Sequence, residues 1–115
     1  MWYTLKNFSV ASDRAITAKV QMPADCVWFD GHFPNMPILP GVAQLTLVAD
    51  LLNRAMKRSV VIRSISRVRF KQMIRPNDTI AVSLSPTQKD AATYGFRLSN
   101  GPELVCSGTI TIAAL

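Results

Sequence analysis

The sequence has few residues that could bind a metal or form a disulfide, with one histidine and two cysteines among its 115 residues. Cys26 and Cys106 are far apart and match none of the spacings typical of metal or redox sites. One histidine without an acidic cluster offers too few ligands for zinc, so we expect no metal and no other cofactor. The first ten residues lack the charged-then-apolar pattern of a signal peptide, which argues against a disulfide.

Long apolar runs and acidic residues are also scarce. No apolar run approaches the roughly 18–20 residues needed to span a bilayer, so we expect a cytoplasmic protein without a membrane segment. The 7 Asp and Glu are outnumbered by 13 Lys and Arg, and the formal net charge of +6 favours acidic partners. Nucleic acid is not expected, because the aromatic residues are not interleaved with the basic ones as stacking platforms would be.

Apolar residues, in contrast, make up 49% of the chain, which is enough for the core of one domain. We expect a single domain over residues 1–115, because no repeat, low-complexity tract or linker divides it. A composition this apolar is also typical of obligate oligomers, in which the interface buries a second apolar surface.

The order of apolar and turn residues predicts strands, one long helix and then more strands. Residues 2–10 and 15–22 have strand character, and one helix is expected from about Gly41 to Lys57, with Pro40 in its first turn. The first three turns of this helix are apolar nearly all round, which is typical of a buried helix. We therefore expect a sheet to wrap around it.

The second half of the chain has the pattern of strands joined by turns. Residues 59–73 alternate, which predicts a strand with one basic face made of Arg63, Arg67, Arg69 and Lys71. A turn is expected at residues 75–78, and further strand character covers residues 80–84, 94–98 and 104–112. Asn100-Gly101 is a hairpin signal between the last two. The whole pattern predicts an α+β domain.

The one histidine, His32, lies in a segment rich in proline and glycine just before the predicted helix. Prolines and glycines on both sides restrict the backbone around it. A side chain that titrates near neutrality is thus held beside a helix N-terminus, where free amides can receive negative charge. This combination favours acid/base chemistry on a carbonyl compound, while a structural histidine in a proline-rich loop is the alternative.

Two segments resemble a known family. Gly31-His32-Phe33-Pro34, with Pro37 and Pro40-Gly41-Val42, resembles the active-site segment of 3-hydroxyacyl-acyl carrier protein dehydratases. Downstream, Val68-Arg69-Phe70-Lys71 with Ile74, Pro76 and Asp78 is similar to the family's Lys-Phe strand that ends in Pro-Gly-Asp. Asn77 stands where glycine is usual, and both residues tolerate a positive φ.

The resemblance implies a hotdog fold, in which a curled antiparallel sheet surrounds one long helix. It also implies dimers with joined sheets and active sites at the interface, formed with a second copy or with a related dehydratase subunit. The substrates would be acyl chains on the phosphopantetheine arm of an acidic acyl carrier protein. The basic residues that we expect to help dock this carrier are Arg69, Lys71 and Arg75.

Removal of water from a 3-hydroxyacyl thioester needs a base for the proton beside the carbonyl and an acid for the departing hydroxyl. His32 suits the role of base near pH 7. By resemblance, the Gly41 backbone amide donates to the carbonyl oxygen as it gains charge. The residues expected to line the substrate site are Phe29, Phe33, Met36, Pro40 and Val42.

The chain departs from the family at the acid. The family carries Glu or Asp fourteen positions after the histidine, where this sequence has Thr46, and a hydroxyl is a far weaker acid than a carboxyl. Asp50 lies one helical turn further along and is an alternative acid, although a carboxylate paired with a neighbour is the other interpretation.

The sequence is compatible with three functions. The chain is a dehydratase with an altered acid position, or a non-catalytic or half-catalytic subunit whose related partner supplies the carboxyl. The third is a hotdog thioesterase, which is disfavoured because Thr46 does not supply the carboxylate that hydrolysis usually needs.

Overall fold

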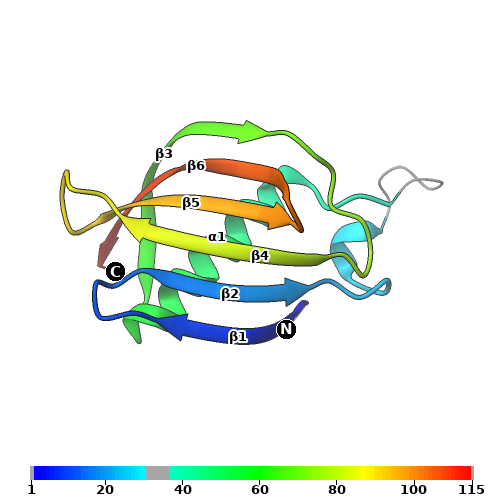
Figure 1. The fold of residues 1–115 in the computed structure, drawn as a ribbon, viewed down its shortest axis with the longest axis horizontal. Coiled ribbons are helices and arrows are strands. Elements are labelled where there is room, and N and C mark those ends of the chain that lie inside the picture. Colours follow the sequence, from blue (N-terminus) through cyan, green and yellow to red (C-terminus); the bar gives the residue numbers. More distant parts are fainter. Residues whose placement is uncertain (1, 31–36, 115) are drawn as a thin grey trace.

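The computed structural model describes residues 2–30 and 37–114 and contains one antiparallel sheet of six strands around one long helix (Figure 1). The strands lie in the order β1-β2-β4-β5-β6-β3, so β1 and β3 form the two edges. The helices are a short 3-10 helix η1 (Val27–Phe29) and α1 (Gly41–Met56). The strands are β1 (Thr4–Val10), β2 (Ile16–Gln21), β3 (Val60–Phe70), β4 (Thr79–Pro86), β5 (Thr93–Asn100) and β6 (Glu103–Ala114).

The core lies between α1 and the face of the sheet that curls around it (Figure 1). Alternate residues of the central strands are buried there, as in Ile80, Val82 and Leu84 of β4 and Tyr94, Phe96 and Leu98 of β5. The helix buries one continuous side made of Ala43, Gln44, Leu47, Val48, Leu51 and Leu52. This arrangement confirms the predicted α+β class and the helix enclosed by a sheet.

The bounds of α1 agree with the prediction to within one residue. Pro40 caps the helix in an extended conformation, one position before the first turn where it was expected, and Lys57 ends the helix in a left-handed conformation. The expectation that the first turns are buried all round is only partly right. Val42 is 60% exposed and Thr46 is exposed, because the sheet of a single chain covers only one side of the helix.

The predicted alternation of residues 59–73 is only partly right, because two bulges interrupt β3. Arg67 and Arg69 share one face and Phe70 lies on the other, as predicted. Its pairing with β6 shifts between Ile62 and Ser64 and again between Ser66 and Arg69. Each extra residue changes which neighbours share a face, so one strict basic face does not form. Lys71 lies beyond the end of the strand, and its backbone amide donates to the Val105 carbonyl at 2.8 Å.

The turns form as the sequence predicts. Asn77 takes a positive φ of 68°, which a glycine would also adopt, and the Arg75 amide donates to the Asp78 carboxylate at 2.9 Å. Gly101 has a φ of +58° in the hairpin between β5 and β6. Within the described ranges, no helix is long and apolar enough to cross a membrane.

Candidate functional site

The predicted base, His32, lies outside the described residues, as do Phe33 and Met36 of the expected substrate lining. The described part of the site consists of the start of α1 and the residues around it. Pro40, Gly41 and Val42 follow one another at this point, whereas Phe29 is 7% exposed and belongs to the core.

The Gly41 backbone amide belongs to the first residue of α1, where amides have no carbonyl partner within the helix. The Pro40 carbonyl accepts from the amides of Ala43 and Gln44, at 3.1 and 3.3 Å. Within the described part of the chain, no group accepts a hydrogen bond from Gly41, and no side chain caps the helix. The partial positive charge of a helix N-terminus therefore remains available to an oxygen that gains negative charge.

A side chain at position 41 would collide with the next element. A Cβ built on Gly41 would lie 2.8 Å from Cζ of Phe70, the last residue of β3. The Phe70 ring thus packs directly on the first residue of the helix, which a glycine allows. This contact places the end of β3 beside the start of α1.

Sequence reasoning missed Gln44, whose side chain lies one turn into the helix and is 3% exposed. Its amide nitrogen donates to the Leu39 carbonyl at 3.5 Å, while its Oε1 atom has no hydrogen-bond partner among the described residues. The Leu39 amide in turn donates to the Ile74 carbonyl at 2.8 Å. Leu39, which lies two residues before Gly41, is therefore hydrogen-bonded both to Gln44 and to Ile74. A polar residue among apolar helix positions was the signal available in the sequence.

Thr46 is exposed on the uncovered side of α1, one turn after Val42. Its hydroxyl donates to the Val42 carbonyl at 2.8 Å, as is common for threonine within helices. The only proton of this hydroxyl is thus committed to the backbone. Thr46 can accept a hydrogen bond in this geometry, but it has no proton directed outward for a leaving group.

Asp50 is engaged by two neighbours and is half-buried. It accepts a hydrogen bond from the Tyr3 hydroxyl and lies 3.7 Å from Nε of Arg54. Burial raises the pKa of Tyr3 to about 12, and the hydrogen bond to Asp50 adds to this shift. The three residues join the segment before β1 to the middle of α1. Nothing local in the sequence indicates a partner 47 residues away.

The two cysteines are free and buried. Burial raises the pKa of the Cys106 thiol to about 11, so the reactive thiolate is scarce at neutral pH. Both cysteines therefore pack as small core residues, and neither offers a nucleophile to the site.

Large apolar side chains are exposed near the start of α1 and along β3. Val42 is 60% exposed, Phe70 51% and Met73 48%, and Val61 and Ile62 are also exposed. Because β3 is an edge strand, its outer hydrogen-bonding groups are unpaired within the sheet of this chain. Exposed apolar residues beside an open sheet edge are typical of a protein–protein interface.

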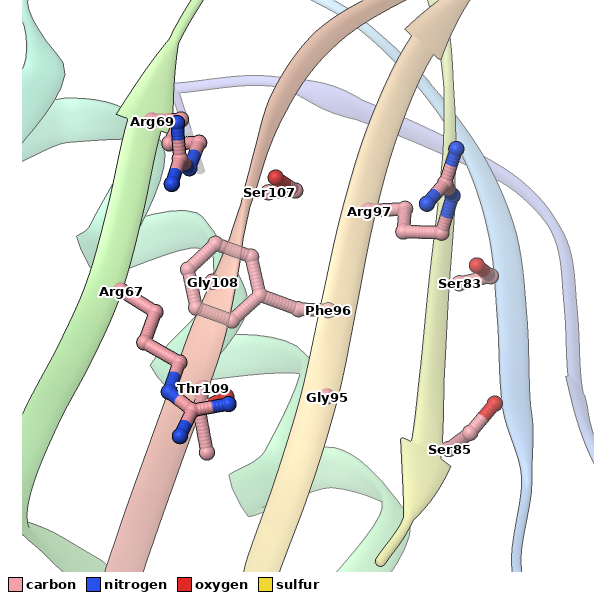
Figure 2. Close-up of a pocket in the computed structure, with 10 residues that line it drawn as sticks. All are labelled: Arg67, Arg69, Ser83, Ser85, Gly95, Phe96, Arg97, Ser107, Gly108 and Thr109. Atoms are coloured by element: carbon pink, nitrogen blue, oxygen red, sulfur yellow. The ribbon is translucent and has the colours of Figure 1, made fainter.

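The expected carrier-docking residues do not form one cluster. Arg69 lies with Arg67 and Arg97 around a hollow of about 390 Å³ on the face of the sheet that points away from α1 (Figure 2). Lys71 and Arg75 do not line this hollow. The remaining lining residues are Ser83, Ser85, Gly95, Phe96, Ser107, Gly108 and Thr109.

Comparison with known proteins identifies relatives of the chain. A family model for ApeI-like proteins, described as ApeI dehydratase, matches residues 9–109. The chain is 33% identical over 95 residues to the 3-hydroxyacyl-[acyl-carrier-protein] dehydratase FabZ of Clostridioides difficile, covering 75% of this chain and 67% of that protein. It is 35% identical over 78 residues to FabZ of Chlamydia pneumoniae, covering 60% of this chain and only 51% of the relative.

A solved structure has the same fold. The structure described as the dehydratase heterocomplex ApeI:P from Xenorhabdus doucetiae matches with a TM-score of 0.86 at 23% identity, over 98% of this chain and 99% of the matched chain. This match confirms the expected hotdog fold.

Proposed function

The chain belongs to the ApeI-like dehydratase family, and from this premise we propose that residues 1–115 form one hotdog domain that dehydrates 3-hydroxyacyl thioesters on acyl carrier protein. The reaction removes the proton from C2 and the hydroxyl from C3, so the products are the trans-2-enoyl thioester and water. The observation that carries the proposal is the Gly41 amide at the start of α1, which has no acceptor among the described residues and lies in the segment that resembles the family's active site.

The Gly41 amide has a defined role in this chemistry. When a base removes the C2 proton, the electrons of the C–H bond move toward the thioester carbonyl, and its oxygen gains negative charge. A fixed N–H donor at a helix N-terminus stabilises that charge without reorganisation. In this proposal, His32 is the base and Gly41 supplies the donor, while Pro40 and Val42 flank the acyl chain.

The acid for the departing hydroxyl is proposed to come from a related partner subunit. Two observations support this assignment. The Thr46 hydroxyl donates its proton to the Val42 carbonyl, and the Asp50 carboxylate is engaged by Tyr3 and Arg54. The chain is then the half-catalytic member of a heterodimer, and the exposed apolar residues along β3 are its interface.

The test compares this chain alone with the chain mixed with an acid-bearing relative, using a carrier-bound 3-hydroxyacyl substrate and following the enoyl product. We expect little turnover alone and a gain on the order of 10²–10⁴ in the mixture, the usual contribution of one acid or base. His32→Ala should abolish turnover in the mixture. A mixture in which His32→Ala is as active as the parent would rule out this chain as the source of the base.

Two variants test the source of the acid directly. Thr46→Glu should raise the activity of the chain alone, because a carboxyl returns to the position where the family carries one. Asp50→Asn should leave turnover in the mixture unchanged. If Asp50→Asn removes activity instead, Asp50 has the role of the acid and the partner's contribution is not needed.

A further inference from the structure

The sheet is strongly biased toward basic residues. Within the strands the only acidic residue is Glu103, the first residue of β6, whereas the basic ones are Lys6, Lys19, Arg63, Arg67, Arg69 and Arg97. Lys6 and Lys19 even lie directly opposite each other on β1 and β2. Like charges in that position destabilise a sheet, so the bias is not explained by folding.

The strand registers align part of this charge in one row on the outer face, the face that points away from α1. Arg97 of β5 pairs with Ser107 of β6, and Ser107 pairs with Arg69 of β3. Two strand spacings separate the arginines, which is about 10 Å. Two guanidinium groups at this separation can contact neighbouring anionic groups of one partner.

A bulge adds a third arginine. Between Ser66 and Arg69, β3 carries one residue more than β6, and Arg67 has a φ of +56° at this point. In an uninterrupted strand Arg67 would lie on the face opposite to Ser66, whereas here both residues line one hollow together with Thr109. In this structure it lines the same hollow as Arg69 and reaches toward Thr109 (Figure 2). Bulge positions with a positive φ usually hold glycine, so an arginine there is strained.

The three arginines surround an open hollow. Gly95 leaves open space where a Cβ would stand, and serine and threonine hydroxyls fill much of the lining. Among the described residues, none forms an ion pair with Arg67, Arg69 or Arg97. Because guanidinium groups stay charged at any ordinary pH, this cluster is available to an anionic partner.

The charged surface extends beyond one hollow. A second hollow of about 260 Å³ shares Ser83 and Arg97 with the first and adds Lys19. A third of about 280 Å³ shares Arg67 and Thr109 and adds Lys89. No acidic residue lines any of the three. A basic surface that crosses most of the sheet suits a macromolecule better than a small ion.

We propose that the arginine face, defined as Arg67, Arg69 and Arg97, docks an acidic surface of the acyl carrier protein. The proposal rests on the proposed function, which makes the carrier the source of the substrate. The position of the arginine face also supports this proposal. Arg69 and Phe70 are successive residues on opposite faces of β3, and the Phe70 ring contacts Gly41. A carrier on this face is thus one sheet layer, about 10 Å, from the start of α1. Lys71 and Arg75 are then secondary contacts.

The experiment compares one 3-hydroxyacyl chain on two supports, the carrier protein and free pantetheine, with the partner subunit present. Charge reversal of the arginine face (R67E, R69E and R97E together) should raise KM for the carrier-bound substrate roughly tenfold or more, and leave kinetics with the pantetheine thioester unchanged. The matched control is K6E, K57E and R58E, which changes net charge equally at exposed residues outside the three hollows. Its effect on KM should be much smaller.

Arg67→Gly separates docking from folding. Glycine adopts a positive φ without strain, so the bulge should persist and the thermal midpoint should not fall. KM for the carrier-bound substrate should nevertheless rise. Salt should raise KM of the parent protein more than KM of the charge-reversed variant, because exposed charges are screened.

Several outcomes would overturn the proposal. One is an equal KM change in the two charge-reversed triples, and another is no change in either. Loss of partner-subunit binding with unchanged affinity for the carrier would assign the arginine face to the assembly instead. If the parent turns over neither substrate, the proposed function fails. A direct titration of the parent and the charge-reversed variant with the carrier then still decides the docking proposal.

Discussion

The inner and outer faces of the sheet are built from the same strands, yet their side chains interact in different ways. On the inner face, alternate residues of β4 and β5 are buried against α1. On the outer face, the residues between them are Ala81, Ser83, Gly95 and Arg97, and the arginines of this face have no ion-pair partner among the described residues. The inner face is therefore held by packing, whereas the charge of the outer face has no counterpart among the described residues.

Neighbouring residues make this difference measurable. Phe96 is 1% exposed and fills the inner side, while Arg97 is exposed on the outer side. The two glycines that border the hollow differ in the same way. A Cβ on Gly108 would meet the Phe96 ring at 2.7 Å, whereas a Cβ on Gly95 would meet nothing within 4 Å. Substitutions on the inner face should cost stability, and substitutions on the outer face should cost binding.

The largest effect is expected for Phe96→Ala. Removal of a fully buried ring should lower the free energy of unfolding by about 3–5 kcal/mol, because it leaves a cavity under β6. Denaturant titration followed by circular dichroism measures this loss. Arg97→Ala is the adjacent control and should change stability by no more than about 0.5 kcal/mol. Similar losses at both positions would remove the distinction between the two faces.

Gly108→Ala should come next. The added methyl group would press on the Phe96 ring, which is buried and cannot swing into solvent. We expect a loss of about 1–3 kcal/mol, the usual cost of overpacking. The same denaturant titration detects it. The double variant with Phe96→Leu should recover part of the loss, and the contact argument would be wrong if it recovered none.

Tyr3→Phe should have a smaller effect, of about 1 kcal/mol near neutral pH, through loss of the hydrogen bond to Asp50. Its pH dependence is more specific. The pKa of Tyr3 is raised from its usual value near 10 to about 12, so the folded state holds this proton more tightly than the unfolded state does. The stabilisation is complete below pH 10 and is lost as the pH rises toward 12.

The measurement for this prediction is the difference in unfolding free energy between the parent and Tyr3→Phe from pH 8 to pH 12. The difference should shrink above pH 10, because other groups that titrate there are common to both proteins. A difference that stays constant over this range would contradict the assigned cause of the pKa shift.

Gly95→Ala should have the smallest effect on stability. The position is open, so a methyl group fits, and the loss of chain freedom in the unfolded state offsets any cost. We expect a change within about 0.5 kcal/mol in thermal or chemical unfolding. A loss as large as that of Gly108→Ala would show that the two faces tolerate side chains equally.

Several features of the fold could be predicted because local sequence determines them. Pro40 and Gly41 mark the start of the helix, and the apolar period marks its length. Asn77 and Gly101 supply the positive φ values that their turns require. The resemblance of the segment around His32 and Gly41 indicated the family correctly, while the role of His32 remains a prediction, since it lies outside the described residues.

Other features could not be predicted, because they depend on which distant segments pair. The alternation of β3 failed at its bulges, since their positions are set by the register with β6. Asp50 could be recognised as a candidate acid, but its contact with Tyr3 depends on where the chain before β1 is placed. The basic stripe predicted along one strand became a cluster from two strands, β3 and β5, with β6 between them.

The helix, the turns and the class of chemistry follow from local sequence, because periodicity, backbone restriction and the types of side chain are local properties. The folded chain is needed to show that Phe70 packs on Gly41, that the Thr46 hydroxyl donates to a helix carbonyl, and that three arginines meet on one face. The physical reason is that strand register and helix placement are set by the packing of the whole core, and this packing selects which side chains come into contact.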